Sequence, residues 1–226
     1  MLALVLLGLP ALASAAEEAD SELYKVTYLR AAPGKLEPLI DFLKQESPAN
    51  RPMIMRHSQG DQWDLLLLEE IGNYQDYFAT RGDEKDERVF INALTSFREE
   101  LFAYGPPAED VRALYEANSF FHIEMFAALP GLHEELIKER EMENDYLVRT
   151  GRSPNLIFVG DLGSDIDSFT IGFYPSIVEF AAPAPVSDEE ANEAAIAAGF
   201  KARSDIGFYL RNFLAYHHDT LAVKVE

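Results

Sequence analysis

The chain has 226 residues, of which 48% are apolar and 12% aromatic, and 39 acidic against 19 basic side chains give a formal net charge of −20. This apolar fraction is sufficient for a hydrophobic core and argues against intrinsic disorder. The negative charge makes nucleic acid and acidic membrane surfaces poor partners. Because the sequence contains no cysteine, disulfides, thiolate metal sites and cysteine nucleophiles are excluded.

The first residues have the composition of a secretion signal. Residues 1–15 carry no charged side chain and lead into a run of small residues, which Glu17 and Glu18 follow. The segment is too short to span a bilayer core, which needs about 20 residues, but it lacks the usual basic start. We expect residues 1–15 to be a signal peptide and the mature protein to be exported, periplasmic or secreted, without membrane insertion. The alternative is a frayed apolar N-terminus.

Two segments about 97 residues apart share one pattern, which indicates an internal repeat. Residues 23–34 and 120–131 each have the pattern of an alternating strand that ends in a Pro-Gly turn. A helix is predicted after each turn. The first is amphipathic, with apolar residues spaced i, i+3, i+4 and i+7 from Leu36 to Leu43. The second is longer, and its acidic run at residues 134–145 is expected to be a solvated face.

The second part of each half also matches. Strands are predicted at residues 52–57 and 154–159, and a turn with a third strand at residues 60–68 and 163–171. Both halves then return to helical spacing and end in a short strand. The last predictions cover a helix through Phe90, Leu94, Phe97 and Leu101, a helix from Ile206 to Leu214, and closing strands at 111–115 and 221–225. A capping box at Ser187 and Glu190 begins an additional helix in the second half.

Each half therefore has the order of a ferredoxin-like unit, within residues 22–116 and 117–226, and the fold class is α+β. Because such a unit covers one sheet face only, its other face needs a partner. The chain resembles the dimeric α/β-barrel superfamily, and its turn at residues 60–64 with Tyr74–Tyr77 is most similar to NIPSNAP or EthD-type members. The resemblance implies two tandem-duplicated units packed sheet against sheet around a cavity. We then expect a monomer or a weak homodimer.

Strand alternation assigns side chains to two faces of each sheet. One face of the first strand in each half is uniformly apolar and is expected beneath the helices: Tyr24, Val26 and Tyr28, and then Phe121, Ile123 and Met125. The other face is expected to line the cavity: Lys25, Thr27 and Leu29, and then His122, Glu124 and Phe126.

His122 and Glu124 are the candidate catalytic acid/base pair. An imidazole and a carboxylate at i and i+2 lie about 7 Å apart, close enough to share a substrate or a water. The alternative is a buried pair that satisfies itself. Lys25, His57, Trp63 and Phe126 are the candidate substrate-binding residues, whose alternative role is ordinary packing.

His217, His218 and Asp219 form a secondary candidate group. His217 continues the apolar stripe of the predicted helix, and the other two lie where that helix should end. Two imidazoles and a carboxylate can ligate zinc or non-haem iron, but adjacent side chains rarely converge on one ion. The alternative is that the histidines stabilise a helix C-terminus, and we assign no metal ligand.

Three functions remain open at this stage. The first is a cofactor-poor monooxygenase or isomerase acting on a small apolar or aromatic molecule between the two sheets. The second is a non-catalytic binding or interaction protein of the NIPSNAP-like type. The third and least favoured is a haem or metal binder using His122, His57 or His217. We expect no cofactor, a small-molecule ligand and no nucleic acid partner.

Overall fold

The computed structural model describes residues 21–47, 51–80 and 85–225. The predicted signal peptide of residues 1–15 lies outside the described residues. Within the described ranges, no helix is both long and apolar enough to cross a membrane.

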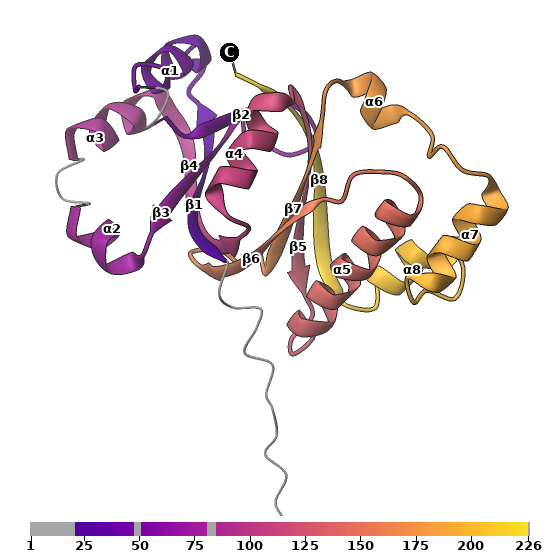
Figure 1. Cartoon of the computed structure of the whole chain (residues 1–226). Helices are drawn as coiled ribbons and strands as arrows, with labels where there is room; N and C mark the ends of the chain where they lie inside the picture. Colours follow the sequence, from indigo (N-terminus) through magenta and orange to yellow (C-terminus); the bar gives the residue numbers. More distant parts are fainter. Residues whose placement is uncertain (1–20, 48–50, 81–84, 226) are drawn as a thin grey trace, which may run out of the picture.

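Eight strands and the helices between them form two halves joined by one helix (Figure 1). The first half contains β1 (Glu22–Ala31), α1 (Leu36–Leu43), β2 (Met53–Gln59), β3 (Leu65–Gly72), α2 (Tyr74–Thr80), α3 (Lys85–Leu94) and β4 (Thr95–Gly105). The joining helix is α4 (Ala108–Ala117). The second half contains β5 (Phe120–Ala128), α5 (His133–Arg149), β6 (Leu156–Leu162), β7 (Ser168–Tyr174), α6 (Ile177–Ala181), α7 (Asp188–Ala197), the short η1 (Arg203–Asp205), α8 (Ile206–Leu210) and β8 (Leu214–Lys224).

The strands form one closed antiparallel barrel in the order β1-β3-β2-β8-β5-β7-β6-β4. Both halves have the same internal order, β4-β1-β3-β2 in the first and β8-β5-β7-β6 in the second. Two seams join them, where β2 pairs with β8 and β4 pairs with β6. The predicted α+β fold of two ferredoxin-like units that close into a barrel is confirmed, and their origin by duplication stays a prediction.

The barrel interior is filled by one apolar cluster that both halves share. Tyr24, Phe121, Phe158 and Phe169 are fully buried in it, and Phe158 stacks on Phe169 with ring centroids 4.6 Å apart. Helix α4 adds Tyr115, whose hydroxyl donates to the backbone oxygen of Ile54 at 3.0 Å. The expected cavity between the two sheets is therefore wrong, because side chains occupy this space.

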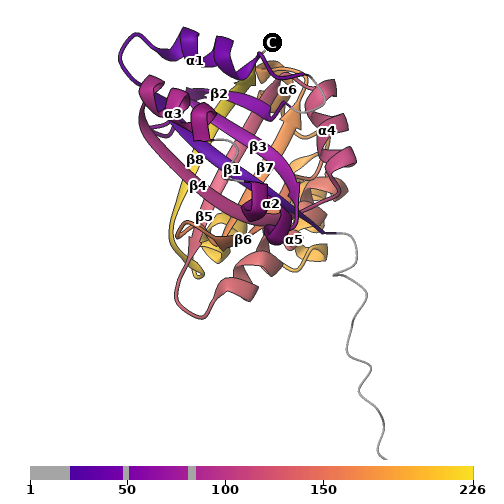
Figure 2. The same cartoon turned by 90° about the vertical axis from the view of Figure 1, so that its left-hand side faces the viewer.

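The prediction of which sheet face turns inward is also wrong. The uniformly apolar face, including Tyr24 and Phe121, lines the barrel interior, whereas the face of Leu29 and Phe126 packs beneath helices. Figure 2 shows α1, α2 and α3 on the outer side of the first half's sheet. A closed barrel excludes water completely, so it selects the face without charges. A helix layer leaves gaps to solvent and tolerates Lys25 or Glu124 beneath it.

Two sequence patterns near residue 100 gave the wrong element. Phe97 and Leu101 were expected in a helix but lie in β4, and residues 111–115 were expected in a strand but lie in α4. A spacing of four residues fits both a helix and one face of a strand, and pairing with β1 along β4 selects the strand. Likewise, the predicted helix at 206–214 ends at Leu210, and β8 follows.

The hairpin turn of each half presses against the last strand of the other half. A Cβ atom at Gly60 would overlap the backbone oxygen of Asp219 in β8, and one at Gly163 would overlap that of Glu100 in β4. Asp64 and Asp167 close the same turns, each carboxylate accepting from a backbone N–H at the end of β1 or β5 at 2.7 Å. The conserved order of residues in the two turns thus positions the seams.

We expect Gly163→Ala to destabilise the protein more than Gly34→Ala. Both glycines have positive φ, 96° and 74°, but only Gly163 meets another strand. The positive φ alone costs about 1–2 kcal/mol, and the overlap with Glu100 adds about 1–3 kcal/mol. Urea unfolding of both variants measures the difference, and equal losses would show that the turn does not press on the seam.

Candidate functional site

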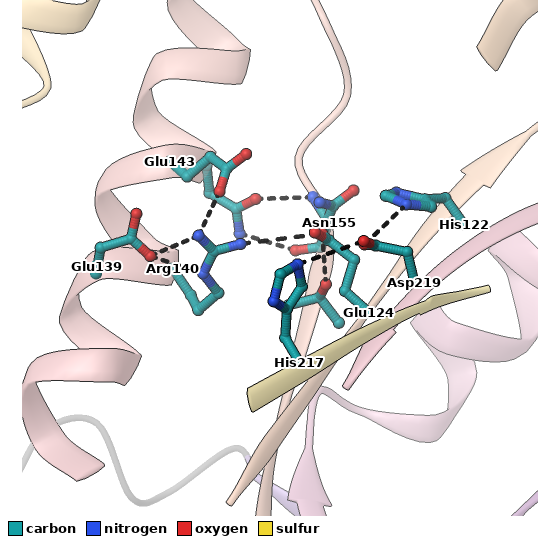
Figure 3. A network of polar contacts seen from close by, with 10 residues as sticks. His122, Glu124, Glu139, Arg140, Glu143, Asn155, His217 and Asp219 are labelled. Carbon is teal, nitrogen blue, oxygen red and sulfur yellow. Dashed lines mark hydrogen bonds and ion pairs between the residues drawn. The ribbon is translucent and has the colours of Figure 1, made fainter. Parts of the chain in front are cut away.

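Four titratable side chains meet on the outer face of the second half's sheet. His122 and Glu124 project from β5, and β8 places Asp219 directly opposite Glu124 and His217 opposite Phe126. We call His122, Glu124, His217 and Asp219 the β5–β8 cluster. It lies between the sheet and α5, as Figure 3 shows. The predicted pair therefore acquires two of the three secondary candidates through strand register.

Asp219 lies between the two imidazoles. One of its carboxylate oxygens is 3.6 Å from His122 Nε2, and the other is 3.4 Å from His217 Nε2. The His217 ring is stacked on Phe126 with centroids 6.1 Å apart and 10° between the planes. About half of the Asp219 side chain is exposed, at 54%, against 20% for His122. The cluster is thus reached from solvent on its Asp219 side.

Glu124 is held from two sides. Thr170 on β7 donates its hydroxyl to Glu124 Oε2 at 3.2 Å, and Arg140 Nη1 on α5 lies 3.9 Å from the same oxygen. The Arg140 guanidinium is 4.6 Å from the centroid of the Phe126 ring and pairs with Glu139 and Glu143 at 2.5 and 2.6 Å. Arg140 thereby fixes α5 over the cluster.

The protonation states of the cluster are separated by their surroundings. Burial raises the pKa of Glu124, which the negative charge of Glu143 reinforces although His122 and Arg140 oppose it. Contact with His122 lowers the pKa of Asp219. Burial lowers the pKa of His122, but the contact with Asp219 and the charge of Glu124 outweigh it, so the net shift is upward. A carboxyl group inclined to be neutral thus lies beside an ionised carboxylate and a basic imidazole, the separation that acid/base sites use.

Two spaces adjoin the cluster. His217 lines a cavity of about 320 Å³ together with residues of η1 and α8, among them Phe208, Leu210 and Arg211. A more open hollow of about 700 Å³ lies where Asp219 and His218 meet the turn at residues 60–62. The first volume falls within the range of small-ligand sites. A molecule with an apolar or aromatic body can therefore approach the cluster.

The same donors satisfy a first test for a metal. One donor atom each of His122, Glu124 and Asp219 lies within 4.8 Å of the others. Two nitrogen and oxygen donors on neighbouring strands suit a divalent transition metal. The ion pair to Arg140 already compensates Glu124, however, and no part of the arrangement requires a metal for charge balance.

The other predicted site residues lie elsewhere. Lys25 is on the outer face of the first half, paired with Glu69 at 2.5 Å. His57 and Trp63 contact each other at 5.8 Å between ring centroids, and Trp63 belongs to the barrel's interior cluster. His218 points away from the β5–β8 cluster and bonds Asp61 at 3.0 Å. A single pocket that unites these residues with His122 is therefore wrong.

The sequence reading missed Arg140 and Thr170. Glu139 and Arg140 were expected on a solvated helix face, yet 0% and 3% of their surfaces are exposed, and burial raises the pKa of Glu139 to about 7 despite Arg140. The available signal was position, since Arg140 is the helical neighbour of the apolar Leu136 and Leu147 and stands alone among acidic residues.

The sequence matches no protein-family model and no curated protein. Its structure is similar to that of an anthrone oxidase-like protein, at 11% identity with a TM-score of 0.62 over 92% of this chain and 93% of that one. A protein described as a "putative monooxygenase" from Fusobacterium nucleatum gives 0.55 at 11% identity, covering 92% and 94%. A variant of the chlorite dismutase of Candidatus Nitrospira defluvii gives 0.51 at 7% identity, covering 92% of both chains. These likenesses establish the dimeric α/β-barrel fold.

We expect the His122 imidazole to titrate above its usual pKa of about 6.5 and Asp219→Asn to lower that pKa. Because the folded pKa is the higher one, protonated His122 stabilises the fold fully below pH about 6.5, and this contribution is lost as pH rises through the folded pKa. NMR titration of the histidine ring resonances measures the midpoint. A midpoint at or below 6.5, or one unchanged in Asp219→Asn, would contradict the contact.

Proposed function

We propose that the protein binds a small aromatic or apolar molecule at the β5–β8 cluster and converts it by cofactor-poor acid/base chemistry of the monooxygenase or isomerase type. The observation that carries this proposal is the ionised Asp219 between His122 and His217, beside the buried Glu124. The adjoining cavity and the Phe126 ring supply an apolar surface for the substrate. The fold shared with an anthrone oxidase-like protein and a "putative monooxygenase" supports the reaction class.

The chemistry begins with removal of a proton. Neutral His122 accepts a proton from an acidic C–H or a phenolic O–H of the substrate, and Asp219 stabilises the imidazolium that forms. The resulting substrate anion has two outcomes. In an isomerase, Glu124 in its neutral form returns a proton at another atom of the substrate. In a monooxygenase, the electron-rich anion reduces molecular oxygen, which is then the co-reactant.

The same proposal includes features of the chain beyond the cluster. We infer that residues 1–15 direct export, that the two halves arose by duplication, and that the closest functional type is NIPSNAP or EthD-like. A specific observation favours a second function, non-catalytic binding: Glu124 is already held by Thr170 and Arg140. On that alternative the cluster stabilises α5 and only the cavity beside His217 takes a ligand.

We expect His122→Asn to reduce turnover by about 10²–10⁴-fold, the typical contribution of a general acid or base. The assay follows oxygen consumption and substrate absorbance with a panel of hydroxylated aromatics, including anthrones. His218→Asn is the matched control, because His218 is on the same strand as His217 and faces away from the cluster. Circular dichroism and thermal unfolding confirm that each variant is folded.

Three results would decide between the functions. Turnover of His122→Asn at the wild-type rate would refute the acid/base role. Tight ligand binding without turnover in the wild type would favour the non-catalytic alternative. Treatment with a chelator should leave turnover unchanged, and loss of turnover that zinc or iron restores would assign the His122, Glu124 and Asp219 donors to a metal instead.

A further inference from the structure

The first half has a cavity at the place that the β5–β8 cluster occupies in the second. Lys25 and Thr27 on β1 are 97 positions before His122 and Glu124, and Thr27 pairs with Glu100 on β4 as Glu124 pairs with Asp219 on β8. Above the second sheet, α5 fills this position with its Arg140 ion pairs. Above the first sheet, between β1, β3 and helices α1 and α3, there is a cavity of about 620 Å³.

The walls of this cavity are largely apolar. Leu29 and Leu67 from the sheet, and Leu43 and Ile91 from α1 and α3, line it and are buried. Phe42 and Phe90 also line it, with their ring centroids 4.5 Å apart. Phe90 is 49% exposed, although it is a large aromatic side chain. An apolar molecule of moderate size therefore finds both a lined chamber and an aromatic pair that reaches solvent.

Three cationic side chains also line the cavity, in a chain whose net charge is −20. Lys25 is paired with Glu69, and Arg98 with Glu100, both at 2.5 Å. Arg88 is half-buried and has no ion pair with any residue whose side chain the structure describes. Its charge is therefore the one that remains to be balanced, whereas the two neighbouring carboxylates disfavour a ligand with several negative charges.

We propose that this cavity is a second ligand site, which takes an amphipathic organic monoanion such as a carboxylate with an aliphatic or aryl body. A guanidinium binds a carboxylate through two parallel hydrogen bonds, and the Arg88 side chain supplies it. The leucine, isoleucine and phenylalanine walls bury the apolar body. The volume lies within the range of about 300–1,000 Å³ that small-molecule sites occupy. The site lies on the opposite side of the barrel from the β5–β8 cluster and does not depend on it (Figure 1).

The test uses a dansyl-labelled undecanoic acid as a fluorescent probe of the full-length protein, and its methyl ester as a neutral probe of the same shape. We expect the acid to bind one molecule per chain and the ester to bind at least 10-fold more weakly. Arg88→Gln should weaken binding of the acid at least 10-fold, and Arg88→Lys should restore part of it. Phe90→Ala should weaken both probes, because it removes apolar wall and leaves the charge.

The matched control is Arg211→Gln, which removes an exposed arginine from the cavity beside His217. Arg211→Gln and His122→Asn should both bind the acid as the wild type does. The proposal is overturned if the acid does not bind, if Arg88→Gln binds it with unchanged affinity, or if acid and ester bind equally. It is also overturned if Arg211→Gln rather than Arg88→Gln weakens binding, which would place the anion in the second half.

Discussion

Barrel closure is the constraint on which the rest of the structure depends. Strand β8 pairs with β2 and β6 pairs with β4, so each half supplies the hydrogen-bonding edge that the other lacks. These seams turn two open sheets into one closed surface whose interior is a single aromatic cluster. An interior filled in this way has no room for a ligand. Polar chemistry is therefore displaced to the outer faces, where helices cover the sheets incompletely and charged groups keep access to water.

The element order could be predicted from the sequence because alternation and helical spacing are local patterns. The direction of each sheet face could not be, since alternation defines two faces without saying which one the barrel encloses. Tyr24 and Lys25 illustrate the point: the resemblance to a barrel with a cavity suggested that Lys25 faces inward. Desolvation decides otherwise, because an unpaired ammonium group inside a closed apolar core costs far more than one beneath a helix with Glu69 beside it. The faces with charges are the outer faces for that reason.

The candidate site was predictable only in part. His122 and Glu124 share a face at adjacent positions, so their proximity follows from local geometry. Asp219 and His217 join them through the register of β5 with β8, a long-range pairing that local patterns do not specify. Their assignment to a helix end hid this pairing. Arg140 was hidden differently, because a charged residue in an acidic run is normally solvated, and only the tertiary position of α5 shows that this one is buried.

The two halves use the same framework for different chemistry, and the helix above each sheet explains the difference. Helices α1 and α5 begin at equivalent positions, Leu36 and His133, but they contain 8 and 17 residues. Leu43, the last residue of α1, is the equivalent of Arg140, which lies in the middle of α5. A leucine at the end of a short helix cannot neutralise carboxylates, and no further turns of helix follow it to cover the sheet. The second half therefore buries a self-compensating polar cluster, whereas the first half retains a chamber in which Arg88 still lacks an anion among the described side chains.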